Sequence, residues 1–227
     1  MYTRRFWIDH IPLIAMAKRP GGPYPGTVLL YHGLKASKET HLKELEQLAE
    51  RGFLAIGVDA HGHGERALPD LSAFMAEGGD FHGNFLKLVR PTVAEIPHLV
   101  ARLASMEQTG PVAVTGISMG GYIAFAAPLV CPGLATVVPI LGSPVWESSH
   151  DSPHLRPEAF EQVALLAWNA GRDVNVPPGP AREFVARIGK EYVEYAESDH
   201  FMRPEDWHDG WRRTLDWLER YLSMHAR

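Results

Sequence analysis

The sequence predicts an α/β fold in which a mostly parallel sheet is covered by helices on both faces. Short runs of β-favouring apolar residues recur along the chain and are typical of strands buried on both sides. Stretches with apolar residues three and four positions apart separate these runs and are typical of helices that pack on a sheet. Because 227 residues can form one large α/β domain, we expect a single domain over residues 1–227.

Composition and charge narrow the range of partners. The chain is 45% hydrophobic and 22% charged, carries a net charge of −5, and has no cluster of lysine and arginine. We therefore expect neither a nucleic-acid nor a membrane partner. Cys131 is the only cysteine, so no disulfide can form within the chain. Together with the absence of a long apolar run, this favours a cytoplasmic protein; the sequence leaves the oligomeric state open.

The first residues are expected to form two strands of a hairpin, Arg4 to Ile8 and Leu13 to Lys18. A signal peptide is the alternative, because the apolar stretch after the arginines ends in small residues. That stretch is only seven residues long, 11–17, and is interrupted by Pro12, so we favour the strands. Pro20 to Gly26 is too rich in proline and glycine for a regular element and is predicted to be a loop.

The next segment is predicted to be a strand, helix and strand unit. Thr27 to Tyr31 and Phe53 to Val58 are buried strands, and Gly52 ends the helix between them. Ser37 is the expected N-cap of that helix. Its core-facing residues are Leu42, Leu45, Leu48 and Ala49. Such a unit forms a right-handed crossover between parallel strands.

Residues 66–85 interrupt the alternation and are expected to be a small insertion over the edge of the sheet. A long helix follows, with apolar residues from Leu86 to Leu103 on one face. Pro91 and Pro97 lie within this pattern, so the helix either begins near Pro91 or is kinked.

The most informative stretch is Gly116-Ile117-Ser118-Met119-Gly120, which follows the apolar run 111–114. A strand can turn into a helix within one residue only if the backbone at the apex is strained, and side chains two positions on either side would collide unless both residues are glycine. The turn would expose the Ser118 hydroxyl and place the Met119 amide at a helix N-terminus. This pattern is a nucleophile elbow.

The remaining chain continues the alternation. The predicted strands are 136–141, 163–168 and 191–196, and the predicted helices run from Met119 to about Cys131, from Pro180 to Ile188, and onward from Pro204. In such sheets ligands bind at the carboxyl ends of the strands. The polar residues expected there are His32, Asp59, Ser118, Ser143, Asp173 and His200.

A serine nucleophile requires a base within hydrogen-bond distance and a carboxylate that orients the base. His200 is the candidate base, because it lies between the last strand and the last helix. Asp173, which follows the strand ending at Trp168, is the candidate acid. Its rivals are Asp199, Glu197, Glu147 and Asp151.

The oxyanion hole is predicted to consist of two backbone amides, those of Leu34 and Met119. His32 is expected to brace the loop that carries Leu34. The segment Asp59 to Gly64 contains a His-x-His pair, but two ligands make a weak metal site, and a loop shaped by hydrogen bonds is favoured. We expect neither a metal nor a cofactor. The candidate substrate-binding residues are His32, Phe81, Trp146 and Phe201.

The motifs His32-Gly33, Asp59-x-His61-Gly62-His63-Gly64, Gly116-x-Ser118-x-Gly120, Asp173 and His200 follow one another as in the α/β-hydrolase superfamily. The chain resembles the small bacterial serine esterases of the prolyl-oligopeptidase and dienelactone-hydrolase branch over nearly its full length. It departs from dienelactone hydrolases, which use cysteine as nucleophile, and from prolyl peptidases, which carry a propeller or another large accessory domain.

The resemblance implies a hydrolase that cleaves carboxylic esters through an acyl-enzyme, and the small insertion favours short acyl groups. A thioesterase, an amide or peptide hydrolase and an acyltransferase would share the same triad. A non-catalytic binding module on the same fold is the alternative from another class. The expected partner is therefore a small-molecule ester.

Overall fold

The computed structural model describes residues 1–106, 110–147 and 149–224. Within these residues eight strands form one sheet, in the order β1-β2-β4-β3-β5-β6-β7-β8. The strands are β1 (Tyr2–Ile8), β2 (Ile11–Ala17), β3 (Thr27–Tyr31), β4 (Leu54–Val58), β5 (Val112–Ile117), β6 (Thr136–Ile140), β7 (Ala164–Ala170) and β8 (Glu191–Tyr195). The pairs β1–β2 and β2–β4 are antiparallel, and the other five pairs of neighbouring strands are parallel. The predicted α/β fold and the opening hairpin are confirmed.

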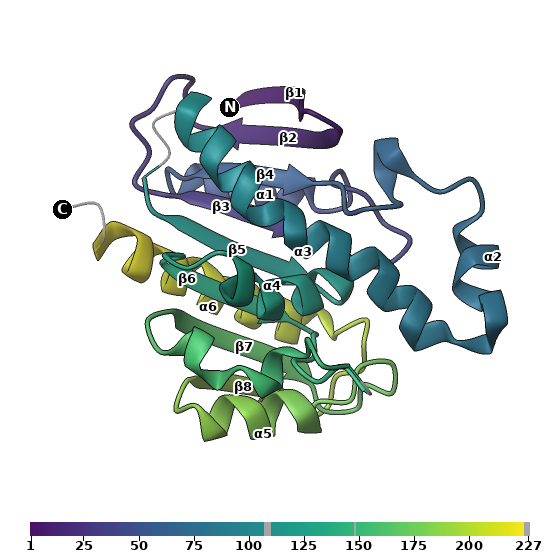
Figure 1. Cartoon of the computed structure of the whole chain (residues 1–227). Coiled ribbons are helices and arrows are strands. Elements are labelled where there is room, and N and C mark those ends of the chain that lie inside the picture. The colour runs from purple at the N-terminus through teal and green to yellow at the C-terminus, as the bar shows by residue number, and fades with distance from the viewer. Residues whose placement is uncertain (107–109, 148, 225–227) are drawn as a thin grey trace.

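Helices cover both faces of the sheet (Figure 1). They are α1 (Leu42–Glu50), α2 (Leu71–Ala76), α3 (Phe81–Met106), α4 (Met119–Val130), α5 (Gly179–Arg187) and α6 (Pro204–Met224). Short 3₁₀ segments occupy Gly64–Arg66, Glu77–Gly79, Pro153–Leu155 and Pro157–Phe160. None of the described helices is long and apolar enough to cross a membrane.

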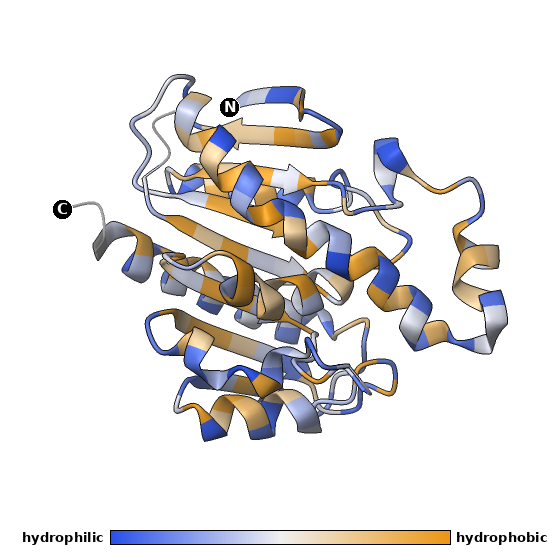
Figure 2. Ribbon diagram, viewed as in Figure 1, coloured by the Kyte–Doolittle hydropathy of each residue, from blue (hydrophilic) through white to orange (hydrophobic). Residues whose placement is uncertain are grey.

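Two hydrophobic clusters form the core, one on each side of the sheet. Alternate residues of β3 show the division: Leu29 packs in the cluster beneath α3, α4 and α5, whereas Leu30 packs in the cluster beneath α1 and α6. The central strands are orange in Figure 2, and blue residues lie on the outer surfaces of the helices. This two-sided burial explains why the parallel strands are apolar without alternation.

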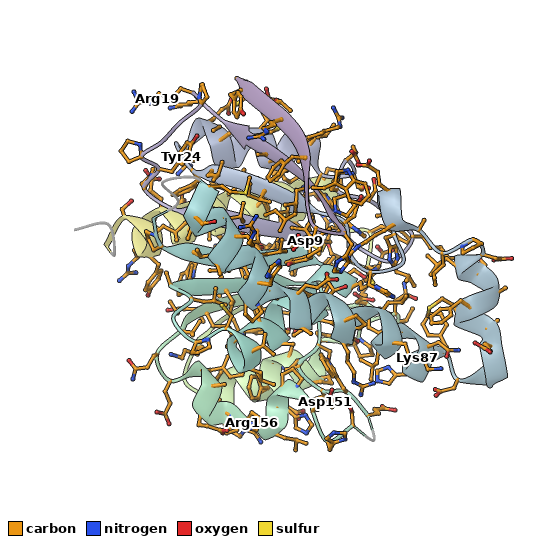
Figure 3. The ribbon with its side chains drawn as sticks, turned by 45° about the horizontal axis from the view of Figure 1, so that its top comes forward. Asp9, Arg19, Tyr24, Lys87, Asp151 and Arg156 are labelled. Carbon is orange, nitrogen blue, oxygen red and sulfur yellow. The ribbon has the colours of Figure 1, made fainter. Side chains whose placement is uncertain are left out.

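The loop between β2 and β3 is closed by one hydrogen bond. The Tyr24 hydroxyl donates to the carbonyl oxygen of Arg19 at 3.1 Å, and Figure 3 labels both residues at the edge of the molecule. The prediction of a loop over Pro20 to Gly26 is confirmed. The bond compensates for the few backbone donors that this proline-rich segment offers.

The predicted N-cap Ser37 is wrong. α1 begins only at Leu42, and the Ser37 hydroxyl donates to Glu39 at 3.1 Å. The reason is that Asp59 accepts hydrogen bonds from both the amide and the ammonium group of Lys38, each at 2.8 Å. These bonds hold the backbone in a turn before the helix can start.

The predicted insertion at 66–85 needs two corrections. Its last residues belong to α3, which starts at Phe81 and is preceded by Asp80, whose carboxylate accepts from the Gly83 amide at 2.9 Å. α3 also continues through Pro91 and Pro97. The second correction concerns position: Figure 1 shows α2, at the right, beyond the carboxyl ends of the strands instead of over an edge of the sheet.

Candidate active site

The nucleophile elbow has the geometry that the sequence predicts. Ser118 lies between the end of β5 and the start of α4, with φ 58° and ψ −112°. A Cβ atom at Gly116 would lie 2.5 Å from the Gly120 carbonyl oxygen, and one at Gly120 would lie 2.2 Å from the Tyr31 carbonyl oxygen. Only glycine fits these two positions, because real Cβ atoms do not approach backbone so closely.

His200 and Asp173 join Ser118 in one continuous chain of hydrogen bonds. His200 Nε2 lies 3.0 Å from Ser118 Oγ, and His200 Nδ1 lies 2.6 Å from Asp173 Oδ2. His200 is placed by the loop between β8 and α6, and Asp173 by the loop after β7. The carboxyl ends of three strands thus bring together residues that are 55 and 27 positions apart in the sequence.

Asp173 is anchored on both of its oxygens. Its second oxygen, Oδ1, accepts from the amides of Asn175 and Val176, each at 2.9 Å, and its side chain is fully buried. The rival carboxylates lie elsewhere. Asp199 is exposed and accepts from the Phe201 amide at 2.9 Å.

Ser198 holds the histidine loop in place, a role that sequence reasoning missed. Its hydroxyl is buried, donates to Asp206 at 2.7 Å and accepts from the Arg203 amide at 3.0 Å. Its carbonyl oxygen accepts from the Arg172 amide at 2.9 Å, which connects the loops that carry His200 and Asp173. The sequence gives only a weak indication of this role, because Ser198 lies five residues before Arg203, which directly precedes α6.

The backbone amides of Leu34 and Met119 are available for an oxyanion. Within the described part of the chain neither amide donates a hydrogen bond. A Cβ atom at Gly33 would lie 3.6 Å from the Ser118 side chain, so the loop that carries Leu34 runs directly beside Ser118. Met119 is the first residue of α4, where the helix dipole favours negative charge.

A buried polar network braces this loop from behind. His32 Nδ1 lies 2.8 Å from the Gly33 carbonyl oxygen, and the Ala60 amide donates to His32 Nε2 at 3.0 Å. Lys38 Nζ lies 2.8 Å from Asp59 Oδ2. Both ring nitrogens of His32 are therefore occupied, and the ring fixes the course of the backbone.

The segment Asp59 to Gly64 is a loop shaped by hydrogen bonds. Asp59 accepts from the Glu65 amide at 2.9 Å, and His63 Nδ1 lies 2.9 Å from the His61 carbonyl oxygen. A Cβ atom at Gly64 would lie 2.1 Å from the Asp59 carboxylate, so this position requires glycine. The structure describes no group of three potential metal ligands in residues 1–106, 110–147 and 149–224.

The buried His32 makes stability depend on pH. Burial lowers its pKa to about 4, and the protonated ring could no longer accept from the Ala60 amide. Because the unfolded chain binds this proton near pH 6.5, stability is complete above that pH and is lost as the pH falls towards 4. We expect the free energy of unfolding to fall by about 2 kcal/mol between pH 6.5 and 4.5.

Urea unfolding measured at several pH values tests this expectation. The pKa values of His61 and His63 are also lowered by burial, so these residues act in the same direction. A free energy of unfolding that stays flat over this range would contradict the assignment of a neutral, buried His32.

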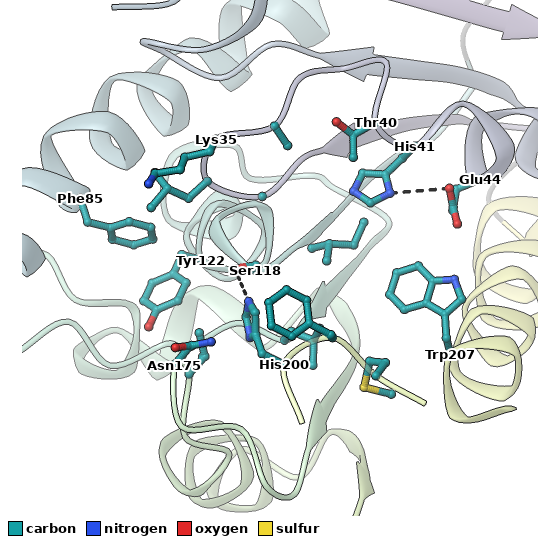
Figure 4. A pocket seen from close by; sticks show the side chains of 18 of the residues that line it. Lys35, Thr40, His41, Glu44, Phe85, Ser118, Tyr122, Asn175, His200 and Trp207 are labelled. Carbon is teal, nitrogen blue, oxygen red and sulfur yellow. Dashed lines mark hydrogen bonds and ion pairs between the residues drawn. The ribbon is translucent and has the colours of Figure 1, made fainter. Parts of the chain in front are cut away.

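A cavity of about 920 Å³ opens beside the serine (Figure 4). Ser118 and His200 line it, as do the predicted pocket residues Phe81 and Phe201. The other lining residues are Gly33, Leu34, Lys35, Ala36, Thr40, His41, Glu44, His82, Phe85, Ile117, Tyr122, Leu141, Asn175, Val176, Met202 and Trp207.

Two predicted substrate-binding residues do not line this cavity. His32 is only 1% exposed and lies behind the loop that carries Leu34. Trp146 is 3% exposed and packs in the core, with the Arg90 guanidinium 6.0 Å from its ring centre. Position at the carboxyl edge does not reveal which way a side chain points, so a role of these two residues in substrate binding stays a prediction.

Aromatic residues that the sequence did not single out form one wall of the cavity. Phe85 of α3 and Tyr122 of α4 meet edge to face, with ring centres 4.9 Å apart. Burial raises the pKa of Tyr122 to about 12, so its hydroxyl stays neutral. Both positions are ordinary core positions on a helical pattern, and only their placement next to Ser118 distinguishes them.

Comparisons with known proteins support the fold. The family model described as "Serine aminopeptidase, S33" matches residues 22–168, which is more than half of the chain. The chain therefore belongs to this family of α/β-hydrolases. A Bacillus subtilis protein named "Putative esterase YitV" is 27% identical, over 86% of this chain and 89% of its own length.

Solved structures show the same fold. TT1662 from Thermus thermophilus superposes with a TM-score of 0.80 at 22% identity, over 97% of this chain and 98% of its own. A cold-adapted esterase from an Arctic intertidal metagenomic library superposes with a TM-score of 0.70 at 17% identity, over 96% of this chain and 92% of its own.

Proposed function

We propose that this protein is a serine hydrolase that cleaves carboxylic esters through an acyl-enzyme. One observation carries the proposal: the continuous chain of hydrogen bonds from Asp173 through His200 to Ser118, which ends at a cavity. The names of the Bacillus subtilis relative and of the Arctic protein, both called esterases, support the same class.

In the acylation step, Ser118 Oγ attacks the ester carbonyl carbon while His200 Nε2 takes the hydroxyl proton. Asp173 keeps the other ring nitrogen protonated and stabilises the imidazolium as it forms. The carbonyl oxygen becomes an oxyanion, which the amides of Leu34 and Met119 stabilise. His200 then gives its proton to the leaving alcohol oxygen, and the acyl group remains on Ser118.

In the deacylation step, His200 removes a proton from a water molecule that attacks the acyl-enzyme. The second oxyanion forms in the same place, and its collapse returns the proton to Ser118 and releases the acid. Because Asp173 is held by two backbone amides as well as by His200, the imidazole stays oriented through both steps. This preorganisation avoids reorientation during the reaction.

We further propose that the acyl group is short, because the Phe85 and Tyr122 rings form a wall beside Ser118. Turnover of p-nitrophenyl acetate, butyrate and octanoate tests this: acetate and butyrate should give the higher kcat/KM. Matched butyrate thioester and anilide substrates separate the thioesterase and amide hydrolase alternatives, and we expect the ester to exceed both. A faster thioester would favour the thioesterase. A faster anilide would overturn the esterase in favour of an amide hydrolase. Highest turnover of octanoate would refute the short acyl group.

A further inference from the structure

The cavity beside Ser118 has two chemically different ends. Figure 4 places Phe85 and Tyr122 on one side of the serine and His41, Glu44 and Trp207 on the other. The first end carries these aromatic rings together with the Lys35 side chain, which Figure 4 places beside Phe85. The second end contains a carboxylate beside an indole, and the triad uses neither of these groups.

The Glu44 carboxylate faces this second end from α1. Among the described residues that line the cavity it is the only carboxylate, and its side chain is 11% exposed. Its nearest basic group is His41, whose Nδ1 lies 3.6 Å away, which is too far for a strong hydrogen bond.

The charge of Glu44 is negative at neutral pH. Burial opposes ionisation, but the His41 ring, the residue's own backbone amide and the Trp207 indole together hold its pKa below the usual value. The ionised carboxylate therefore places a negative charge on the wall of the cavity, and a cation that binds beside it would be attracted to it.

The Trp207 ring is held in a fixed position next to this carboxylate. It meets Trp168 edge to face at 5.5 Å and lies parallel to Trp211 at 6.4 Å between ring centres. Trp168 and Trp211 are buried in the core, so Trp207 forms a preorganised wall of the cavity. Indole faces attract ammonium groups, and aromatic rings with a carboxylate are the usual means of binding quaternary ammonium ions.

We propose that the Glu44 and Trp207 end of the cavity binds a cationic amine or quaternary ammonium group of the substrate. The substrate class would then be esters of amino alcohols or of amino acids, with the carbonyl at Ser118 and the cation at this end. The inference rests on the proposed ester hydrolase and adds the charge of the substrate. The competing interpretation is that Glu44 only links α1 to Trp207 of α6.

Two pairs of substrates with the same shape and different charge test the proposal. Choline butyrate and 3,3-dimethylbutyl butyrate differ only in the ammonium nitrogen of the alcohol. The p-nitrophenyl esters of 4-(trimethylammonio)butyrate and 5,5-dimethylhexanoate differ in the same way on the acyl side. We expect the cationic member of at least one pair to have a kcat/KM about tenfold higher, mainly through KM.

The variant Glu44→Gln should remove this preference by lowering turnover of the cationic member much more than turnover of the neutral member. Glu46→Gln, an exposed position on the same helix, is the matched control and should keep the preference. Equal rates within both pairs on the wild-type protein would overturn the proposal, and that comparison needs no variant to fold. Equal slowing of both members by Glu44→Gln would indicate the structural link instead.

The outcomes also separate this inference from the proposed function. Hydrolysis of the neutral esters without any preference for charge would leave the esterase in place and refute the cation site. Failure to hydrolyse any of the four esters would overturn both.

Discussion

Replacing Ser118 with Ala is expected to lower kcat on p-nitrophenyl butyrate by roughly 10⁴- to 10⁶-fold. Without Oγ, His200 has no hydroxyl to deprotonate, and only the oxyanion amides and substrate binding would still assist an attacking water. The measurement is turnover under saturating substrate, with high protein concentration to reach the residual rate.

The loss of activity should not reflect loss of structure. Alanine at φ 58° carries a backbone strain similar to that of serine, so the melting temperature should change little. Ser143→Ala is a suitable control, because Ser143 also lies at the carboxyl edge but, among the described residues, its side chain bonds to Val145 of its own loop and to Tyr122. We expect it to keep most of its activity. Near-normal turnover in Ser118→Ala would remove Ser118 from the mechanism.

Replacing Asp173 with Asn is expected to lower kcat by roughly 10³- to 10⁴-fold with little change in KM. The amide oxygen can still accept from the amides of Asn175 and Val176, so the loop should keep its course. The amide nitrogen, however, would donate towards His200 Nδ1 and favour the tautomer that cannot accept the serine proton.

Asp199→Asn is the matched control for this prediction. Asp199 is adjacent to His200 in sequence, but its carboxylate is exposed and bonds to the Phe201 amide. Its replacement should change kcat only slightly. A larger loss in Asp199→Asn than in Asp173→Asn would show that the wrong carboxylate has been assigned to the histidine.

The sequence was informative wherever backbone geometry restricts residue type. Gly116 and Gly120 are required by contacts closer than any Cβ atom allows, so the elbow could be located from its spacing. Asp173 and His200 could be placed because parallel strands bring their carboxyl ends together. Burial on both faces made the strands of the sheet recognisable as apolar runs.

The sequence was less informative where a distant contact decides the local structure. The bonds from Lys38 to Asp59 delay the start of α1, and no local pattern around Ser37 reveals them. The cavity walls depend on which helices meet, so Glu44 and Trp207 were indistinguishable from ordinary helix positions. The course of residues 66–85 likewise depends on α3 starting at Phe81.

The most direct test of the proposed mechanism is intact mass spectrometry after treatment with a fluorophosphonate. The wild-type protein should gain the mass of one phosphonyl group, and Ser118→Ala should gain none, because only a serine activated by His200 reacts readily with this reagent. An adduct of equal extent on both proteins, or no adduct on the folded wild-type protein, would contradict a serine hydrolase that acts through Ser118.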